Sequence, residues 1–289
     1  MRILVTGAGG QVGGELARIL PPHGEVLALD RATLDLADPD AIAATMRAAK
    51  PSLVVNAAAY TAVDLAERER ERAFAINARA PEVLAEEARR LGAVLVHYST
   101  DYVFDGRASS PYREDDATGP LNAYGESKLA GERAIASTGA AALVLRTSWV
   151  YGLTGKNFLL TIRRLARERD EIRIVADQLG TPNWSRALAD ATARLVAMGP
   201  AALAERAGLY HFTSTGSTSW HGFARAIVGD APKPVVTPIA TSEYPTPARR
   251  PAYGVLSTAK FERAFGFSLP AWQDALAACL REAGDAPRH

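Results

Sequence analysis

The sequence predicts an α/β protein built on a doubly wound parallel sheet, with a smaller lobe toward the C-terminus. Two observations lead to this fold class. Short apolar runs alternate with amphipathic stretches of helical length through the first half of the 289-residue chain, which is the pattern of repeated strand–helix–strand units. The first apolar run also leads directly into a glycine cluster and then into a helical stretch, as strand, tight turn and helix do in such folds.

Five strands are predicted in the first half, and the third is apolar enough to be buried on both faces of a parallel sheet. They are expected at residues 3–5, 26–29, 53–57, 93–98 and 142–147. Helices should connect them at residues 12–20, 39–49, 81–91 and 123–137, and Pro39 suits the first turn of the second helix. A polar loop should follow at residues 99–122, and the alternating charges of residues 67–72 should form a solvated helix face.

The strand–helix rhythm weakens after about Trp149. Helices are still predicted at residues 157–169 and 185–198, with strands at 172–175 and 208–212, and the last strand should return to the main sheet. A proline-rich turn segment follows at residues 244–251. We therefore expect one domain over residues 1–149, rejoined by about 185–212, and a smaller substrate-binding lobe over residues 150–289.

The overall composition excludes several classes of protein. The net charge is +1, so no overall field attracts the chain to nucleic acid or to an anionic membrane. Cys279 is the only cysteine, which excludes an intrachain disulfide and fits a reducing compartment. No apolar run approaches the roughly 20 residues of a membrane span, and the first residues lack the pattern of a signal peptide. We expect a cytoplasmic protein.

The glycine cluster is the first candidate binding site. Gly7, Gly10 and Gly13 recur every third residue, so the backbone can approach a ligand closely where side chains are missing. The helix that follows offers unpaired N–H groups and a partial positive charge, which suit a pyrophosphate. An ordinary strand–helix turn is the alternative for this pattern taken alone. With this turn, residues 1–149 become a candidate dinucleotide-binding domain.

Asp30 ends the second predicted strand. A carboxylate at this position can accept hydrogen bonds from the ribose of a dinucleotide. The alternative is an aspartate that only caps the strand end. Arg31 follows it and could accommodate a 2′-phosphate, so the pair leaves the choice between NADH and NADPH open.

Tyr124 and Lys128 form a candidate catalytic pair. They are the only tyrosine and lysine separated by four residues in the chain, and in a helix this spacing places both on one face. A neighbouring ammonium, together with a nicotinamide ring, should lower the pKa of the tyrosine and make it a general acid near neutral pH. Lys128 could also hold a ribose. An amphipathic surface pair is the alternative.

Thr100 lies near the carboxyl end of the fourth predicted strand, where ligands bind in open α/β sheets. Its hydroxyl could hydrogen-bond a reacting carbonyl oxygen beside Tyr124, and the alternative is a cap of the strand end. His97 lies inside the strand pattern, so we assign it a structural role and no part in catalysis.

Together these residues resemble the extended short-chain dehydrogenase/reductases, an NAD(P)-binding Rossmann fold. Within them, the chain resembles the dTDP-4-dehydrorhamnose reductases, which complete dTDP-L-rhamnose synthesis for polysaccharides. The matching segments run in order along nearly the whole chain, at residues 10–13, 56–64, 99–106, 120–125, 146–151 and 244–251.

The resemblance implies a reduction of the C4 keto group of a dTDP-sugar by NADPH or NADH. Tyr124 would donate the proton, with Lys128 as its electrostatic partner and ribose ligand. Thr100, Asp101 and Trp149 would contact the sugar. The cofactor would be bound by Tyr124 and Lys128 together with Gly7, Gly10, Gln11, Val12, Gly13, Asp30, Asp35, Leu36, Ala59, Tyr60 and Thr61.

The resemblance also raises the question of a metal, because some members dimerise through a magnesium ion (Mg2+) held by carboxylates of both subunits. Glu15 matches one such ligand and Glu282 matches another, but Arg186 stands where a further glutamate is expected. The positive charge of an arginine side chain repels a metal cation bound at the same site. We therefore expect no bound metal, and a monomer or a different homodimer.

Two other functions remain open for this fold. One is a sugar-nucleotide epimerase or 4,6-dehydratase, but related dehydratases carry Asp-Glu after the threonine, whereas Tyr102 follows Asp101 here. The other is a non-catalytic role like that of the regulatory subunit of methionine adenosyltransferase. The complete set of Thr100, Tyr124 and Lys128 disfavours that role.

Overall fold

The computed structural model describes residues 1–230 and 232–284. Residue 231 and residues 285–289, which belong to the expected C-terminal lobe, lie outside the described part. A six-stranded parallel sheet forms the centre of the fold, in the order β10-β5-β4-β3-β1-β2. The main-sheet strands are β1 (Arg2–Thr6), β2 (Glu25–Leu29), β3 (Leu53–Asn56), β4 (Val94–Thr100), β5 (Ala142–Thr147) and β10 (Gly208–His211).

The strand order reverses at β1, which pairs with β2 on one side and with β3 on the other. In open α/β sheets, ligands bind at the carboxyl ends of the strands beside such a reversal. The predicted return of the chain at residues 208–212 is confirmed, because β10 pairs in parallel with β5. The predicted end of the fourth strand is wrong by two residues, since β4 continues through Ser99 and Thr100.

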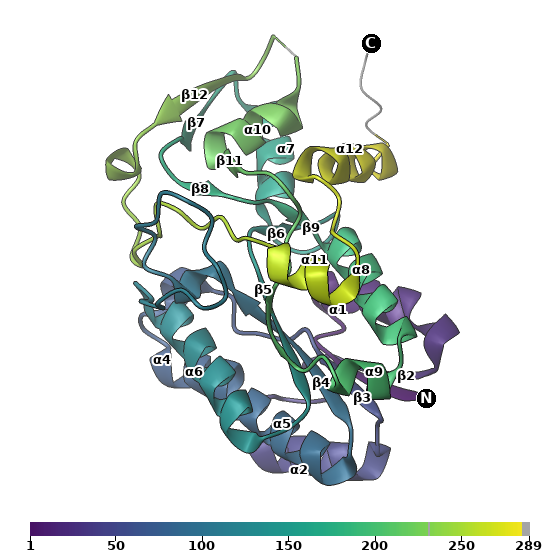
Figure 1. Cartoon of the computed structure of the whole chain (residues 1–289). Coiled ribbons are helices and arrows are strands. Elements are labelled where there is room, and N and C mark those ends of the chain that lie inside the picture. Colours follow the sequence, from purple (N-terminus) through teal and green to yellow (C-terminus); the bar gives the residue numbers. More distant parts are fainter. Residues whose placement is uncertain (231, 285–289) are drawn as a thin grey trace.

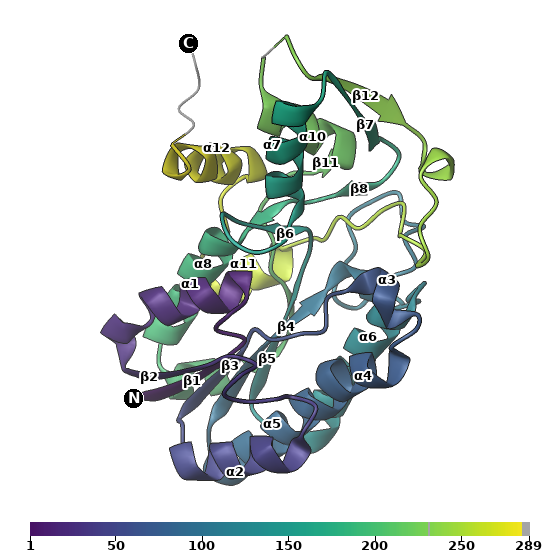
Figure 2. The same cartoon turned by 180° about the vertical axis from the view of Figure 1, so that it is seen from behind.

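Helices cover both faces of this sheet (Figures 1 and 2). One face packs against α2 (Pro39–Ala49) and α5 (Ala80–Leu91), and the other packs against α1 (Gln11–Ile19) and α8 (Ser185–Ala197). Alternation along β1 separates the two cores, because Ile3 and Val5 belong to one and Leu4 to the other. The doubly wound α/β fold is therefore confirmed.

Local sequence signals explain the helix ends of this half. Asp38 accepts hydrogen bonds from the N–H groups of Asp40 and Ala41 and so caps α2, with Pro39 in its first turn. Asn122 caps α6 (Ala123–Thr138) in the same way. The remaining helices of this half are α3 (Val63–Ala66) and α4 (Arg70–Phe74), and a π-helical turn, Ala75–Arg79, joins α4 to α5.

Much of the second half of the chain forms the upper part of the molecule in Figure 1, around smaller apolar clusters. The predicted helix at 157–169 and strand at 172–175 are present as α7 (Phe158–Glu168) and β7 (Glu171–Val175). Four helices of the second half had no sequence prediction. Of these, α10 (Trp220–Val228) and α12 (Trp272–Glu282) lie in this upper part, whereas α9 (Pro200–Ala204) and α11 (Ala259–Phe265) pack on a core of the main sheet. Short strands complete the upper part at β6 (Val150–Tyr151), β8 (Leu179–Gly180), β9 (Asn183–Trp184), β11 (Thr218–Ser219) and β12 (Val235–Ile239).

Among the residues described, none of the helices has the length and apolar character needed to cross a bilayer.

Gly13 is where helix α1 touches the glycine turn. A Cβ on this residue would lie 2.0 Å from the carbonyl oxygen of Gly7, so G13A must push the helix away from the turn. The better helix propensity of alanine, about 1 kcal/mol, does not offset such a backbone clash. We expect G13A to lower the free energy of unfolding by about 1–3 kcal/mol in chemical denaturation.

The matched control is G9A in the same turn, where a Cβ would lie 3.6 Å from the Cβ of Asp30. We expect G9A to remain within about 0.5 kcal/mol of wild type. Equal losses in the two variants would show that the close contact at Gly13 does not constrain the fold.

Candidate active site

A pocket of about 920 Å³ lies at the carboxyl ends of the central strands. The glycine turn after β1 forms one end, and the loops after β2 and β3 form its sides. Tyr124 and Lys128 of α6 and Thr147 at the end of β5 also line it. The pocket is therefore where the reversal of strand order predicts a ligand.

Nearly all residues predicted to hold the cofactor line this one pocket. Gly13 is the exception, because it is buried against the turn and has a packing role. The others are Gly7, Gly10, Gln11, Val12, Asp30, Asp35, Leu36, Ala59, Tyr60, Thr61, Tyr124 and Lys128. Sequence reasoning missed Arg72 and Lys156, which add positive charge to the lining. No motif marked either residue, since they come from a charged stretch and a loop.

The N-terminus of helix α1 suits a phosphate group. Gly10 is its N-cap and makes no side-chain capping bond, and the first turn carries no acidic residue. Helices α2, α6 and α7, in contrast, are capped by aspartate or asparagine side chains. The first N–H groups of α1 therefore remain available to an anion in the pocket, and the residues present fit a dinucleotide.

Asp30 lines the pocket and also shapes its own loop. Its Oδ1 accepts hydrogen bonds from the N–H groups of Ala32 and Thr33 at 3.0 Å and from the Thr33 hydroxyl at 2.9 Å. The side-chain bond from Thr33 is the main cause that lowers the pKa of Asp30. The carboxylate thus remains ionised, as acceptance of ribose hydroxyls requires.

Contacts with two residues of strand β4 hold the Lys128 side chain in place. Its side chain is almost fully buried, and Nζ donates a hydrogen bond to the carbonyl oxygen of Tyr98 at 2.6 Å. Nζ also lies 3.1 Å from Nε2 of His97. Burial lowers the pKa of Lys128 to about 8, although the nearby charge of Glu132 acts in the opposite direction.

His97 belongs to a buried polar chain that runs behind the pocket. Its Nδ1 lies 2.9 Å from the side-chain nitrogen of Asn56, and Asn56 in turn accepts a hydrogen bond from the Thr6 hydroxyl at 2.6 Å. Burial, followed by the charge of Lys128, lowers the pKa of His97 well below its ordinary value. The neutral imidazole therefore has a structural role, as predicted. It also contacts Lys128.

The lowering of the Tyr124 pKa expected from Lys128 is not found, and the lowering expected from a nicotinamide ring stays a prediction. Burial raises the pKa of Tyr124 to about 12, and a hydrogen bond with Thr100 opposes this only in part. Lys128 is not among the groups that shift the pKa of this phenol, and its Nζ is bonded to the carbonyl oxygen of Tyr98 and adjoins His97. Tyr124 thus keeps its proton at neutral pH.

The residues expected to contact a sugar lie beyond the lining of this pocket. Thr100 and Asp101 are both buried, with 5% and 1% of their surface exposed. Trp149 stacks on Trp220, with ring centroids 3.5 Å apart and planes at 9°. Trp149 also has a φ of 43°, a left-handed conformation that is costly for a bulky residue and often marks a functional position. Trp220 had no sequence signal.

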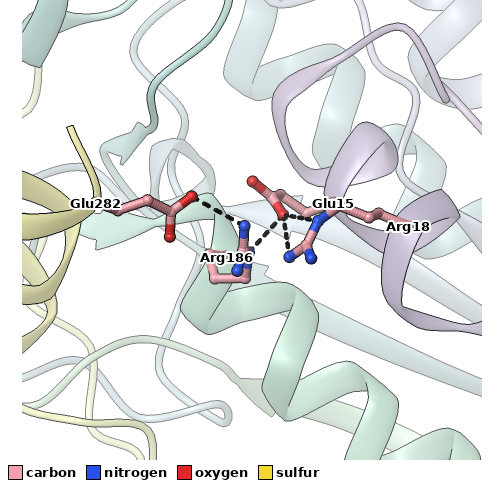
Figure 3. Close-up of polar contacts among 4 residues, drawn as sticks. All are labelled: Glu15, Arg18, Arg186 and Glu282. Carbon is pink, nitrogen blue, oxygen red and sulfur yellow. Dashed lines mark hydrogen bonds and ion pairs between the residues drawn. The ribbon is translucent and has the colours of Figure 1, made fainter. Parts of the chain in front are cut away.

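Arg186 lies between Glu15 and Glu282 and joins three helices that are distant in sequence (Figure 3). Its Nε donates to Glu15 at 2.5 Å and its Nη2 donates to Glu282 at 3.0 Å. Arg18 also pairs with Glu15, at 3.0 Å. Both carboxylates that match metal ligands are thus paired with a guanidinium of the same chain, so these residues do not fit a metal ion.

We expect Mg2+ to have no effect at this cluster. Addition of millimolar Mg2+ or of a chelator should leave both the melting temperature and the molecular mass from light scattering unchanged, because the guanidinium already neutralises the carboxylates. A dimer that forms with Mg2+ and dissociates with chelator would contradict this expectation. Among the described residues, no group of three or more His, Cys, Asp or Glu side chains is placed to hold a metal.

A parallel sheet, an uncapped helix behind a glycine turn and a tyrosine–lysine pair in one pocket define an NAD(P)H-dependent oxidoreductase. The family model described as "RmlD substrate binding domain" matches residues 1–284. The chain belongs to this family, the dTDP-4-dehydrorhamnose reductases.

Two curated relatives and one solved structure illustrate the similarity. The dTDP-4-dehydrorhamnose reductase of Burkholderia thailandensis is 53% identical, over 98% of this chain and 99% of the relative. The reductase of Escherichia coli K12 is 44% identical, over 98% of each chain. The crystal structure of the Bacillus anthracis reductase in complex with NADP has a TM-score of 0.91 and 36% identity, and the match covers 97% of this chain and 99% of that one.

Proposed function

We propose that the chain reduces the C4 keto group of dTDP-4-dehydrorhamnose with NADPH or NADH, giving dTDP-L-rhamnose. One observation carries this proposal: a single pocket connects the glycine turn to Tyr124 and Lys128. A cofactor anchored at the turn can therefore present its reactive ring to the tyrosine. The B. thailandensis and E. coli relatives, which are matched over nearly their whole length, carry the name of this activity.

The residues around the pocket would hold the dinucleotide at several points. The N–H groups at the start of α1, near Gly10 and Gln11, suit the pyrophosphate, and Asp30 suits the adenosine ribose. Arg31 and Lys156 add positive charge for phosphate groups. When bound, the reduced nicotinamide supplies the hydride.

Tyr124 would donate the proton to the oxygen at C4. The reaction needs a protonated phenol, and the pKa raised to about 12 keeps the proton on Tyr124 at every pH at which the protein would be assayed. Lys128 would stabilise the phenolate left behind and hold the nicotinamide ribose. Its ammonium is present below its pKa of about 8 and is lost above it.

The sugar would lie between the main sheet and the second lobe, which we place within the described part of residues 150–284, apart from the stretch at about 185–212 that rejoins the first domain. Thr100 and Trp149 would face it, and the Thr100 hydroxyl would bond the carbonyl oxygen beside Tyr124. Asp101, which the family resemblance also places at the sugar, is buried next to Thr100 with 1% of its surface exposed.

An assay with dTDP-4-dehydrorhamnose and either NADPH or NADH tests this function. The loss of reduced nicotinamide absorbance and the formation of dTDP-L-rhamnose should occur together. A changed sugar without consumption of cofactor would instead support an epimerase or dehydratase. A folded protein that turns over neither cofactor would support the non-catalytic role.

A further inference from the structure

Asn157 joins the second lobe to the glycine turn. Its side-chain nitrogen donates hydrogen bonds to Oε1 of Gln11 and to the carbonyl oxygen of Gly152, both at 3.0 Å, and lies 3.1 Å from the carbonyl oxygen of Thr154. Its Oδ1 accepts a hydrogen bond from the N–H of Leu160 at 3.1 Å and so caps α7. The oxygen of this one amide therefore serves the helix, and the nitrogen serves Gln11 and the preceding loop.

The loop at residues 152–156, which this amide closes, packs on the Gln11 side chain. A Cβ on Gly152 would lie 3.5 Å from Oε1 of Gln11 and 2.5 Å from Oγ of Ser185, the first residue of α8. A Cβ on Gly155 would lie 3.6 Å from Cγ of Gln11. Because Gln11 is the first residue of α1, the loop rests against the start of that helix.

The same loop lines the pocket through Thr154, Gly155 and Lys156. Lys156 is exposed, and among the described residues no carboxylate pairs with it. Arg164 of the following helix, in contrast, is paired with Glu168 at 2.7 Å. The ammonium of Lys156 is therefore available to an anion that enters the pocket.

The charges at this end of the pocket select a phosphate group. The start of α1 offers uncapped N–H groups and has no acidic residue in its first turn, and a lysine adds three donors and a positive charge. The acidic residues of the lining, Asp30, Asp35 and Glu69, come from the loop after β2 and from the N-cap of α4. In a dinucleotide, the group that meets the start of this helix is the diphosphate.

We propose that the loop at residues 152–156 is part of the diphosphate site of the cofactor. Lys156 binds the diphosphate from the second lobe, and Asn157 and Gln11 are positioning residues that hold the loop against the start of α1. This inference rests on the proposed reductase function, which puts the dinucleotide in this pocket. The second lobe, expected from the sequence to bind substrate, thereby takes part in binding the cofactor.

The variant K156Q tests the contact with the diphosphate. Both NADPH and NADH carry this group, so we expect titration calorimetry to show a Kd about ten-fold higher for each cofactor. Kd for dTDP should stay within about two-fold of wild type. The matched control is K233Q, which removes the same charge from a lysine paired with Asp170 on the surface and should leave all three Kd values unchanged.

The variant N157S tests the positioning role. Serine is also a good N-cap, so α7 stays capped, but the serine side chain is too short to reach Oε1 of Gln11. We expect Kd for NADPH and for NADH to rise about three- to ten-fold. In the K156Q background the same change should add less than about two-fold, because the loop then carries no cation to position.

Unchanged Kd values for both cofactors in K156Q would overturn the proposal. A rise for NADPH alone would assign Lys156 to the 2′-phosphate, and a rise for dTDP would assign it to the sugar nucleotide, so either result would also overturn it. Equal effects of N157S with and without Lys156 would show that Asn157 has a merely structural role. A wild-type protein that binds NADPH without reducing dTDP-4-dehydrorhamnose would count against the proposed function instead.

Discussion

Replacement of Tyr124 by phenylalanine should lower kcat about 10²–10⁴-fold, the range that a positioned general acid contributes. The phenol is half-buried in the pocket and protonated at neutral pH, so the variant loses the proton but keeps the ring. The ring still packs edge-to-face with Tyr102, so the pocket should keep its shape. We expect kcat and kcat/KM to fall by similar factors, as for an interaction made in the transition state.

Titration calorimetry should show an NADPH Kd for Y124F within about three-fold of wild type, since the glycine turn and Asp30 are untouched. The control is Y210F, which removes a phenol hydroxyl bonded to the carbonyl of Arg206. Residue 210 does not line the pocket, so Y210F should keep kcat. Undiminished turnover by Y124F would show that another group donates the proton.

Replacement of Glu132 by glutamine should lower the free energy of unfolding by about 3–5 kcal/mol, the cost of breaking a buried ion pair by removing one partner. Arg146 and Glu132 form a two-point pair, with Nε–Oε1 at 2.9 Å and Nη2–Oε2 at 2.7 Å. Their side chains are only 3% and 8% exposed. The variant leaves the guanidinium charged and buried against the ring of Phe104.

The double variant E132Q/R146M separates the charge from the packing. Because both charges are then absent, we expect most of the lost stability to return in urea denaturation. The surface control is E168Q, whose pair with Arg164 is more than half exposed and should be worth no more than about 0.5 kcal/mol. An E132Q loss as small as that of E168Q would show that the buried pair does not stabilise the fold.

The main sheet could be predicted because its signals are local. The apolar run at 53–57 and the Asp38–Pro39 helix start each depend on neighbouring residues, and the structure confirms both. The helices α10, α11 and α12 could not be predicted in this way. They lie in the part of the chain where turns interrupt the rhythm, and they are stabilised by packing against other segments. Phe223 of α10, for example, contacts Trp272 of α12.

The candidate site was predicted unevenly for the same reason. Tyr124 and Lys128 are one helical turn apart, so their spacing alone predicted that they share a wall of the pocket. Their charge states could not be predicted, because burial depends on every element packed around them. Lys156 and Trp220 had no signal, since each reaches its place through a loop or helix far along the chain.

The charged stretch 67–72 also makes contacts that could not be predicted from the sequence. Sequence alone predicts a solvated helix face. In the structure, Glu67 accepts a hydrogen bond from the N–H of Ala123 at 2.9 Å, and Arg70 pairs with Glu126. The residues remain largely exposed, but they connect to the helix that carries Tyr124.

The sequence by itself determined the α/β class, the glycine turn, the tyrosine–lysine pair and the mismatch at Arg186, because each depends on residue type and short spacing. Only the tertiary structure decided that Arg186 joins Glu15 to Glu282, that His97 adjoins Lys128, and that Asp101 is buried with one unpartnered oxygen. These features depend on which distant segments meet and how much water they exclude. Burial then shifts the pKa values of Tyr124, Lys128 and Asp101. These shifts cannot be predicted from the order of residues along the chain.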